Sequence, residues 1–142
     1  MIRWILDTDH VSLNERGNPR IQKRLSAIPA HEIGISVITA EELIRGRLAV
    51  LARRSDGAKR VHAYDKFLQT VQFCASVTVV PFDSRCDAKF QELESRRLRV
   101  GSQDLRIAAT ALVHGLTLVT ANAKDFARVP GLSFEDWTVE LG

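Results

Sequence analysis

The chain has 142 residues, enough for one domain with a hydrophobic core, and its 45% hydrophobic and 26% charged residues are typical of a soluble globular protein. A formal net charge of +3 is only a weak indication of nucleic-acid binding. No segment approaches the ~18 apolar residues of a membrane span, and no basic leader precedes an apolar run, so we expect a cytoplasmic protein without a membrane segment.

The first half of the chain alternates apolar runs with helical patterns. Residues 2–6 predict a short buried strand, and a helix follows from about Asp9. Pro19 is expected at the start of a second helix. Residues 33–38 (IGISVI) favour a strand, and residues 39–52 favour a helix that begins at Thr39 and buries Leu43, Ile44, Leu48 and Leu51.

The second half repeats this alternation. Residues 53–59 predict a turn, residues 58–74 a helix, and residues 76–82 a strand that ends near Pro81. Asp83 or Ser84 is expected to cap the next helix, which ends around Leu98. The remaining pattern predicts a helix over 102–114 stopped by Gly115, a strand over 116–120, a helical turn from Asn122 and a short strand near 132–134.

Alternation of strands and helices predicts a single α/β domain over residues 1–142, with a central, mainly parallel sheet flanked by helices. In such sheets, ligands bind at the carboxyl ends of the strands. Cys74 and Cys86 form neither a disulfide framework nor a metal-ligand pattern, and we expect both to be small buried residues. The four histidines also lack metal-ligand spacing.

Two acids stand where the first strands end. Asp7 directly follows the apolar run of the first strand and is either the N-cap of the next helix or part of a binding site. Glu42 is explained either by a capping box with Thr39 or by a ligand, because the residues on its own helical face, Gly46 and Ala49, leave that face bare. Its neighbour Glu41 has Arg45 four residues on, which predicts an ordinary surface ion pair.

Three more polar side chains, in the second half of the chain, lie where a helix begins or where a strand ends. Asp104 opens the otherwise apolar helix QDLRIAATALVH and has no basic residue on its own face, so it either stabilises the helix N-terminus or belongs to a site. Asn122 and Asp125 follow the strand that ends in LVT and are either a cap-like pair or part of the same site.

Carboxylates gathered at one sheet edge need a cation. Two carboxylates ~5 Å apart repel by about 3 kcal/mol at an effective dielectric of ~20. Several of them share a pocket only with a bound cation or with raised pKa values. An all-oxygen set favours Mg²⁺ or Mn²⁺ over zinc, so Asp7 is interpreted as a metal ligand.

Four segments, taken together, carry a resemblance to a known family. ILDTDHVSL, SVITAEELIRGRL, GSQDLRIAATAL and TLVTANAKDFARVPGLSFEDW resemble PIN-domain proteins, and specifically the VapC-type toxins of toxin–antitoxin systems. The resemblance covers essentially the whole chain, in order. It implies a compact α/β fold with a central parallel sheet and a Mg²⁺- or Mn²⁺-dependent endoribonuclease.

The resemblance also assigns the catalytic positions. The family's three acids fall on Asp7, Glu42 and Asp104, which would bind the metal. The fourth position, often an aspartate, is Asn122 here, and Asp125 lies one turn further on, so either residue is a candidate to complete the catalytic site. Thr8 and Thr120 are candidates for assisting hydrogen bonds, whereas His10 is expected to be structural or peripheral.

The expected partners are RNA, a VapB-type antitoxin protein and a second copy of the chain, since the family implies neutralisation by the antitoxin and homodimerisation. Docking of the antitoxin is expected over the bare face of Glu42, Gly46 and Ala49, beside Arg45 and Arg47. The basic clusters that are candidates for RNA phosphates are Arg45, Arg47, Arg53 and Arg54, then Lys59 and Arg60, then Arg96, Arg97 and Arg99.

Three alternatives stay open from the sequence. Asp7 and Asp9 after an apolar strand are also the pattern of a haloacid dehalogenase-like phosphohydrolase, with Asp7 as nucleophile and Asp9 as acid. A catalytically inert PIN scaffold that only binds RNA or a partner would tolerate Asn122. A metal-free ribonuclease would use two of the four histidines, His10, His31, His62 and His114.

Overall fold

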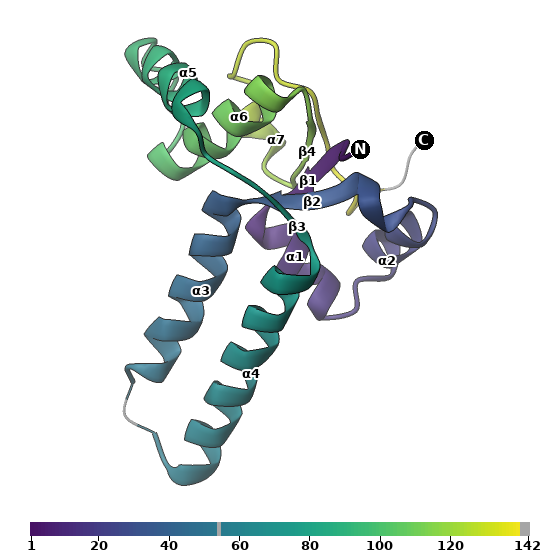
Figure 1. Ribbon diagram of the computed structural model, residues 1–142, viewed down its shortest axis with the longest axis vertical. Helices are drawn as coiled ribbons and strands as arrows, with labels where there is room; N and C mark the ends of the chain where they lie inside the picture. The colour runs from purple at the N-terminus through teal and green to yellow at the C-terminus, as the bar shows by residue number, and fades with distance from the viewer. Residues whose placement is uncertain (54, 140–142) are drawn as a thin grey trace.

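A computed structural model describes residues 1–53 and 55–139, and it has the expected α/β architecture (Figure 1). The central sheet has five strands in the order β3-β2-β1-β4-β5, and every neighbouring pair is parallel. The strands are β1 (Trp4–Leu6), β2 (Ile33–Ser36), β3 (Thr78–Val80), β4 (Thr117–Val119) and β5 (Phe134–Glu135). Strand β1 is central, and the chain moves to opposite sides of it for β2 and β4, which creates a topological switch point beside β1.

Helices connect these strands and cover both faces of the sheet (Figure 1). The α-helices are α1 (Thr8–Glu15), α2 (Pro19–Ser26), α3 (Val37–Leu51), α4 (Gly57–Ser76), α5 (Ser84–Ser95), α6 (Ser102–His114) and α7 (Ala123–Phe126), with a short 3₁₀ turn at Ala30–Glu32. No described helix is long and apolar enough to cross a membrane.

The alternation of side chains along the strands divides the core into two clusters. In β1, Ile5 packs with the α5, α6 and α7 side, where Phe90, Leu105 and Phe126 are buried. Its neighbour Leu6 points to the other face and joins Val11, Ile21 and Trp137. Successive residues of a strand face opposite sides of the sheet, so both faces of β1 are covered and its position is fixed.

Close contact between strands requires a glycine in β2. A Cβ at Gly34 would lie 2.4 Å from Cδ1 of Ile2 and 2.5 Å from the backbone oxygen of Thr78, far inside van der Waals contact. At Gly115, glycine is needed for the backbone conformation: the residue ends α6 with a left-handed φ of 66°, as the sequence predicts.

Two helix starts differ from the sequence-based expectation. Helix α3 begins at Val37, and its N-cap is Ser36, whose hydroxyl accepts the backbone N–H of Thr39 at 3.0 Å. Thr39 therefore lies inside the first turn, and the capping-box interpretation of Glu42 is wrong. Helix α1 begins at Thr8, one residue before the approximate start predicted at Asp9, and Asp7 is its cap.

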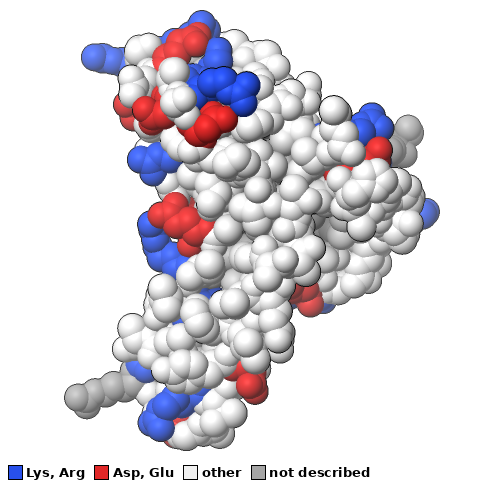
Figure 2. All heavy atoms as spheres, viewed as in Figure 1, with Lys and Arg blue, Asp and Glu red and all other residues white. Residues whose placement is uncertain are grey.

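The α3–α4 hairpin extends away from the sheet and carries the largest error of the predicted core (Figure 1). The expected buried stripe of α3 is wrong at Leu48, which is 50% exposed. Helix α4 exposes four apolar side chains at helical spacing, Val61, Tyr64, Leu68 and Val71. Little charge shows over α4 in Figure 2, whereas acids and bases mix over α5. Helical spacing identifies a face but not what covers it.

Smaller differences concern element ends. Helix α5 ends at Ser95 instead of Leu98, because Arg97 and Arg99 adopt positive φ angles of 51° and 61° that a helix does not permit. The last strand is Phe134–Glu135 rather than 132–134. The predicted turn over 53–59 includes Arg54, which lies outside the described residues.

Candidate active site

The predicted acids come from elements that meet at the carboxyl edge of the sheet. Asp7 follows β1, Glu42 lies in the helix after β2, and Asn122 follows β4. Asp104 is in the first turn of α6, and because α6 leads into the parallel strand β4, its N-terminus lies at this same edge. Four separated parts of the chain therefore converge at the switch point beside β1.

Asp7 is both a helix cap and a buried carboxylate. It is 7% exposed, and its Oδ1 accepts the backbone N–H of His10 at 2.8 Å, as in an N-cap. Nδ1 of His10 lies 3.3 Å from the same Oδ1, and Nε2 of His10 accepts the backbone N–H of Trp137 at 3.2 Å. Because these contacts use Oδ1 only, Oδ2 has no hydrogen bond or ion pair among the described residues.

His10 therefore has a structural role beside the candidate site, as expected. It is fully buried, its Nε2 also lies 3.7 Å from Oδ1 of Asp136, and its Nδ1 makes no hydrogen bond within the described part of the chain.

Glu42 is held by a threonine from another element. The hydroxyl of Thr8 donates to Oε1 of Glu42 at 2.7 Å, which joins the first turn of α1 to α3. Glu41 behaves differently, since it forms the predicted ion pair with Arg45 and accepts Nε2 of Gln103 at 3.1 Å. Of the two adjacent glutamates, only Glu42 faces the candidate site.

Asp104 has the most perturbed carboxylate of the group. Desolvation first, and then the negative charges of Glu42, Asp7, Asp125 and Asp9, raise the pKa of Asp104 to about 6. No hydrogen bond or ion pair from a described residue reaches its carboxylate. Its position in the first turn of α6 provides only the helix dipole as compensation.

The fourth position is built from an amide and an acid. Nδ2 of Asn122 donates to Oδ2 of Asp125 at 3.1 Å, and Nη1 of Arg128 lies 3.4 Å from Oδ1 of Asp125. The backbone N–H of Asn122 donates to the hydroxyl of buried Thr120 at 3.0 Å. Asp125 is thus already paired with a cation, and it acts on Asp104 through its charge.

The residues fit a hard divalent cation. The available donors are carboxylate oxygens, and the half-buried Asp104 carries a charge penalty that a described side chain does not offset. A cation bound among Asp7, Glu42 and Asp104 would remove that penalty. Oxygen donors suit Mg²⁺ or Mn²⁺.

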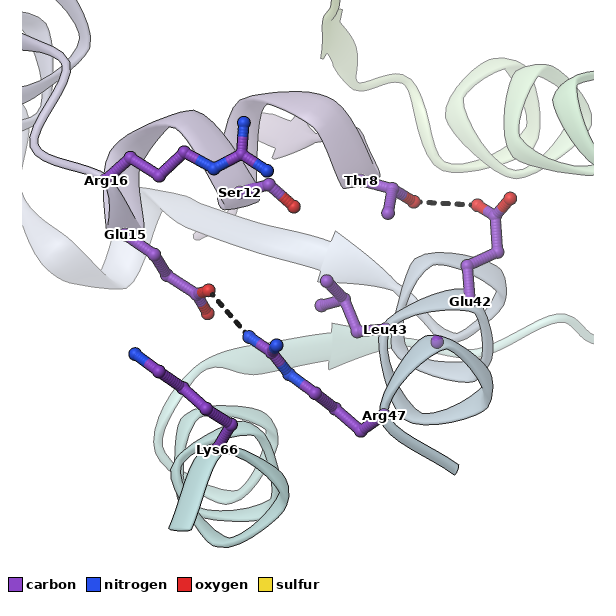
Figure 3. Close-up of a pocket in the computed structure, with 9 residues that line it drawn as sticks. Thr8, Ser12, Glu15, Arg16, Glu42, Leu43, Arg47 and Lys66 are labelled. Carbon is purple, nitrogen blue, oxygen red and sulfur yellow. Dashed lines mark hydrogen bonds and ion pairs between the residues drawn. The ribbon is translucent and has the colours of Figure 1, made fainter. Parts of the chain in front are cut away.

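A pocket of about 400 Å³ begins at Thr8 and Glu42 and continues between α1, α3 and α4 (Figure 3). Beyond the acids, its lining is basic, with Arg16, Arg47 and Lys66. Nη2 of Arg47 lies 3.3 Å from Oε2 of Glu15. The side chains of Arg16 and Lys66 have no hydrogen bond or ion pair within the described part of the chain.

Sequence reasoning missed Arg16 and Lys66. The spacing of Thr8, Ser12 and Arg16 puts them on one face of α1, which identifies Arg16 afterwards. Lys66 belongs to no basic cluster in the sequence, and only the packing of α4 brings it to the pocket.

Three residues of the predicted basic clusters have partners elsewhere in the fold. Arg45 pairs with Glu41, Arg96 with Glu92 at 3.0 Å, and Arg60 donates to the backbone oxygen of Ser55 at 3.2 Å. Arg53 and Lys59 line a second hollow of about 660 Å³ between α3 and α4, together with Arg47 and Lys66. Among the described residues of the predicted clusters, only Arg47 lines the pocket beside the acids.

Comparisons with known proteins agree with this arrangement. The PIN domain family matches residues 5–132. Ribonuclease VapC1 of Rickettsia felis is 32% identical over 133 residues, which are 90% of this chain and 91% of the relative. The tRNA(fMet)-specific endonuclease VapC of Salmonella typhimurium is 28% identical over 142 residues, covering 96% of this chain and 99% of the relative.

A solved structure extends the likeness to three dimensions. The toxin fold in the crystal structure of DNA-bound VapBC from Salmonella typhimurium matches with a TM-score of 0.81 and 27% identity, over 96% of this chain and 99% of that chain. With the family match over residues 5–132 and the VapC relatives along almost the whole length, this chain belongs to the PIN domain family, among the VapC ribonucleases.

Proposed function

We propose that this chain is a divalent-metal-dependent endoribonuclease toxin of the VapC type, which hydrolyses RNA phosphodiester bonds and is neutralised by a VapB-type antitoxin. The observation that carries the proposal is the unpaired, half-buried Asp104, whose carboxylate lies in the negative field of Asp7 and Glu42. The VapC ribonucleases among its relatives support the reaction class. Its proposed place of action is the cytoplasm.

Each residue has a distinct part in this proposal. Asp7, Glu42 and Asp104 hold Mg²⁺ or Mn²⁺, and Thr8 keeps Glu42 in place through its hydrogen bond. Asn122 completes the site with its amide, and the charge of Asp125 acts from one turn further on. When bound, the metal supplies an activated water and offsets charge at phosphorus.

The basic side of the pocket binds the RNA backbone. Arg16 and Lys66 are cations without described partners beside a site that acts on phosphodiesters, so they are the best candidates for phosphate contacts. Because water and not the 2′-hydroxyl is the nucleophile, the expected products carry a 5′-phosphate and a 3′-hydroxyl. Preference for RNA then comes from binding.

The antitoxin is expected on the α3 side of the pocket. A Cβ at Gly46 would meet no atom within 4 Å, so the face next to Glu42 is open to a partner. Among the similar structures are toxin–antitoxin complexes, including VapBC of Salmonella typhimurium. Homodimerisation stays a prediction from the family, and light scattering of the toxin alone is its test.

The function is tested with partner-free protein and total RNA, with and without Mn²⁺, followed by mapping of the cut ends. Asp7→Asn and Asp104→Asn should abolish cleavage while circular dichroism stays that of the wild type. Glu94→Gln, an exposed acid on α5 that is not among the charges raising the pKa of Asp104, is the matched control and should cleave normally. Full metal-dependent cleavage by either active-site variant would contradict the assignment.

The alternatives are less well supported. Asp9, the acid that a haloacid dehalogenase-like reaction needs, is exposed at the first turn of α1, whereas Asp7 is buried. Of the histidines, only His10 contacts an acid of the candidate site, and it is fully buried. Hydrolysis of small phosphate esters without RNA cleavage would favour the phosphohydrolase, and full activity in EDTA would favour a histidine mechanism.

A further inference from the structure

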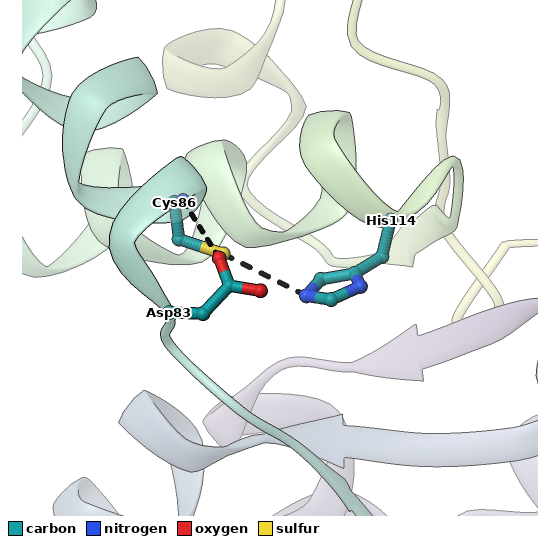
Figure 4. Close-up of side chains that lie close together, drawn as sticks. All are labelled: Asp83, Cys86 and His114. Carbon is teal, nitrogen blue, oxygen red and sulfur yellow. Dashed lines mark hydrogen bonds between the residues drawn. The ribbon is translucent and has the colours of Figure 1, made fainter.

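Three side chains with metal-binding atoms meet where α5 begins and α6 ends (Figure 4). Asp83 is the N-cap of α5, Cys86 lies in its first turn, and His114 is the last residue of α6. Asp104 lies ten residues earlier in α6, so at a rise of ~1.5 Å per residue the two ends are about 15 Å apart. This group is therefore separate from the candidate active site.

The geometry of the group is close to that of a metal site. One ligand atom from each residue, a carboxylate oxygen, Sγ and a ring nitrogen, lies within 4.8 Å of the other two. Sγ of Cys86 lies 3.7 Å from Nε2 of His114. A tetrahedral zinc ion with ordinary bond lengths separates its sulfur and nitrogen ligands by about 3.6 Å. The cysteine and histidine are thus already at ligand spacing, and only the carboxylate must move closer.

The surroundings permit that movement. Oδ1 of Asp83 accepts the backbone N–H of Cys86 at 3.1 Å, and Oδ2 lies 3.1 Å from Nη2 of Arg85, whose side chain is 68% exposed. An exposed ion pair contributes at most about 1 kcal/mol, so a cation can replace Arg85 at low cost. His114 also lines an open pocket of about 500 Å³, which Asp83 and Cys86 do not line, so only the histidine side of the group borders this pocket.

The donor set also selects the kind of cation. A thiolate and an imidazole with one carboxylate suit zinc and related soft divalent ions, and they disfavour Mg²⁺. The carboxylate of Asp83 lies at the surface end of the group, where Arg85 is its exposed partner. The Cys86 thiol is fully buried and must lose its proton to the solvent when a cation binds.

We propose that Asp83, Cys86 and His114 form a second metal site that binds one Zn²⁺, with water as the fourth ligand, and joins the start of α5 to the end of α6. The proposal does not depend on the ribonuclease function. The competing explanation is that Asp83 is only a helix cap and that Cys86 and His114 only contact each other within the core.

Cobalt is the probe for this site, because Co²⁺ bound to a thiolate gives a near-ultraviolet charge-transfer band that oxygen ligands do not give. Full-length protein, stripped with EDTA and kept reduced, is titrated with Co²⁺ and then with Zn²⁺. We expect a band that saturates at one equivalent and disappears when zinc displaces cobalt. Absence of a thiolate band in the folded wild type overturns the proposal.

Variants separate this site from other cysteines and from the acids. In an Asp104→Asn background, which removes the proposed acidic metal site, His114→Gln should lose the band and the zinc-dependent rise in the unfolding midpoint; circular dichroism checks its fold, and Cys86→Ser provides a second test. Cys74→Ser removes the other free cysteine and should keep both signals. Asp104→Asn should also keep both, even if it inactivates the enzyme. A band that survives in His114→Gln, or that is lost in Cys74→Ser, contradicts the assignment.

Discussion

Replacing Asp104 by asparagine should inactivate the enzyme and, without metal, stabilise its fold. In the folded chain, desolvation and the neighbouring acids raise the pKa of Asp104 from 3.8 to about 6. That rise corresponds to about 3 kcal/mol of penalty for the charged form. Because the side chain is half-buried, solvent screening reduces this to about 1–1.5 kcal/mol. Asparagine has nearly the same shape and removes the charge.

The direction of the pH effect on stability follows from which state of the chain, folded or unfolded, binds the Asp104 proton. Between pH 4 and 6 the unfolded chain has already released the Asp104 proton, whereas the folded chain retains it, so the wild type loses stability as pH rises through about 6. The stabilising effect of Asp104→Asn should be absent near pH 4 and complete above pH 7. Urea unfolding in EDTA at several pH values measures it, with Glu94→Gln as control.

Bound metal should make the wild type more stable than Asp104→Asn, the reverse of the order expected in EDTA. Mn²⁺ binds the folded wild type and raises its stability, but it should do little for Asp104→Asn, which lacks a ligand. An asparagine variant that is less stable than the wild type at pH 7.5 in EDTA, or that gains equally from Mn²⁺, would refute the reasoning.

Other substitutions test the neighbours of the site and the sheet. Thr8→Val removes the 2.7 Å hydrogen bond to the site glutamate and should slow cleavage about tenfold, whereas Thr8→Ser should not; equal rates for both contradict this role. Arg16→Ala and Lys66→Ala should each weaken binding of single-stranded RNA and reduce its salt slope by about 0.7; an unchanged slope excludes a phosphate contact. Gly34→Ala would bring a Cβ within 2.5 Å of a backbone oxygen of β3 and should destabilise the fold by about 2 kcal/mol or more in urea unfolding. Gly57→Ala, at the first position of α4 where no atom lies within 4 Å, should be close to neutral, and similar costs for the two would contradict the steric argument.

The sheet and most helices were predictable because local patterns determine them. Short apolar runs between helical patterns indicated a parallel sheet, and Pro19 and Gly115 marked their helix ends as local backbone preferences require. The exposure of Leu48 was not predictable in this way. The spacing of apolar residues identifies a helix face, but whether that face is covered depends on how the α3–α4 hairpin packs.

The sequence pointed to the candidate acids because Asp7 directly follows a strand and Glu42 and Asp104 lie in helices next to strands, and parallel strands bring their carboxyl ends together. Two contacts between side chains could be found only in the folded structure. The hydrogen bond between Thr8 and Glu42 joins residues 34 positions apart. The approach of Cys86 to His114 spans 28 positions and follows no ligand spacing in the sequence. Cys86 is buried as expected, whereas Cys74 is only partly buried.

A crystal grown with Mn²⁺, with anomalous data collected at the manganese edge, shows whether the three acids bind a metal ion. We expect an anomalous peak in contact with carboxylate oxygens of Asp7 and Asp104, with Glu42 bound directly or through a water. Side chains of these three residues that point apart, with no manganese between them in crystals of active protein, would contradict it.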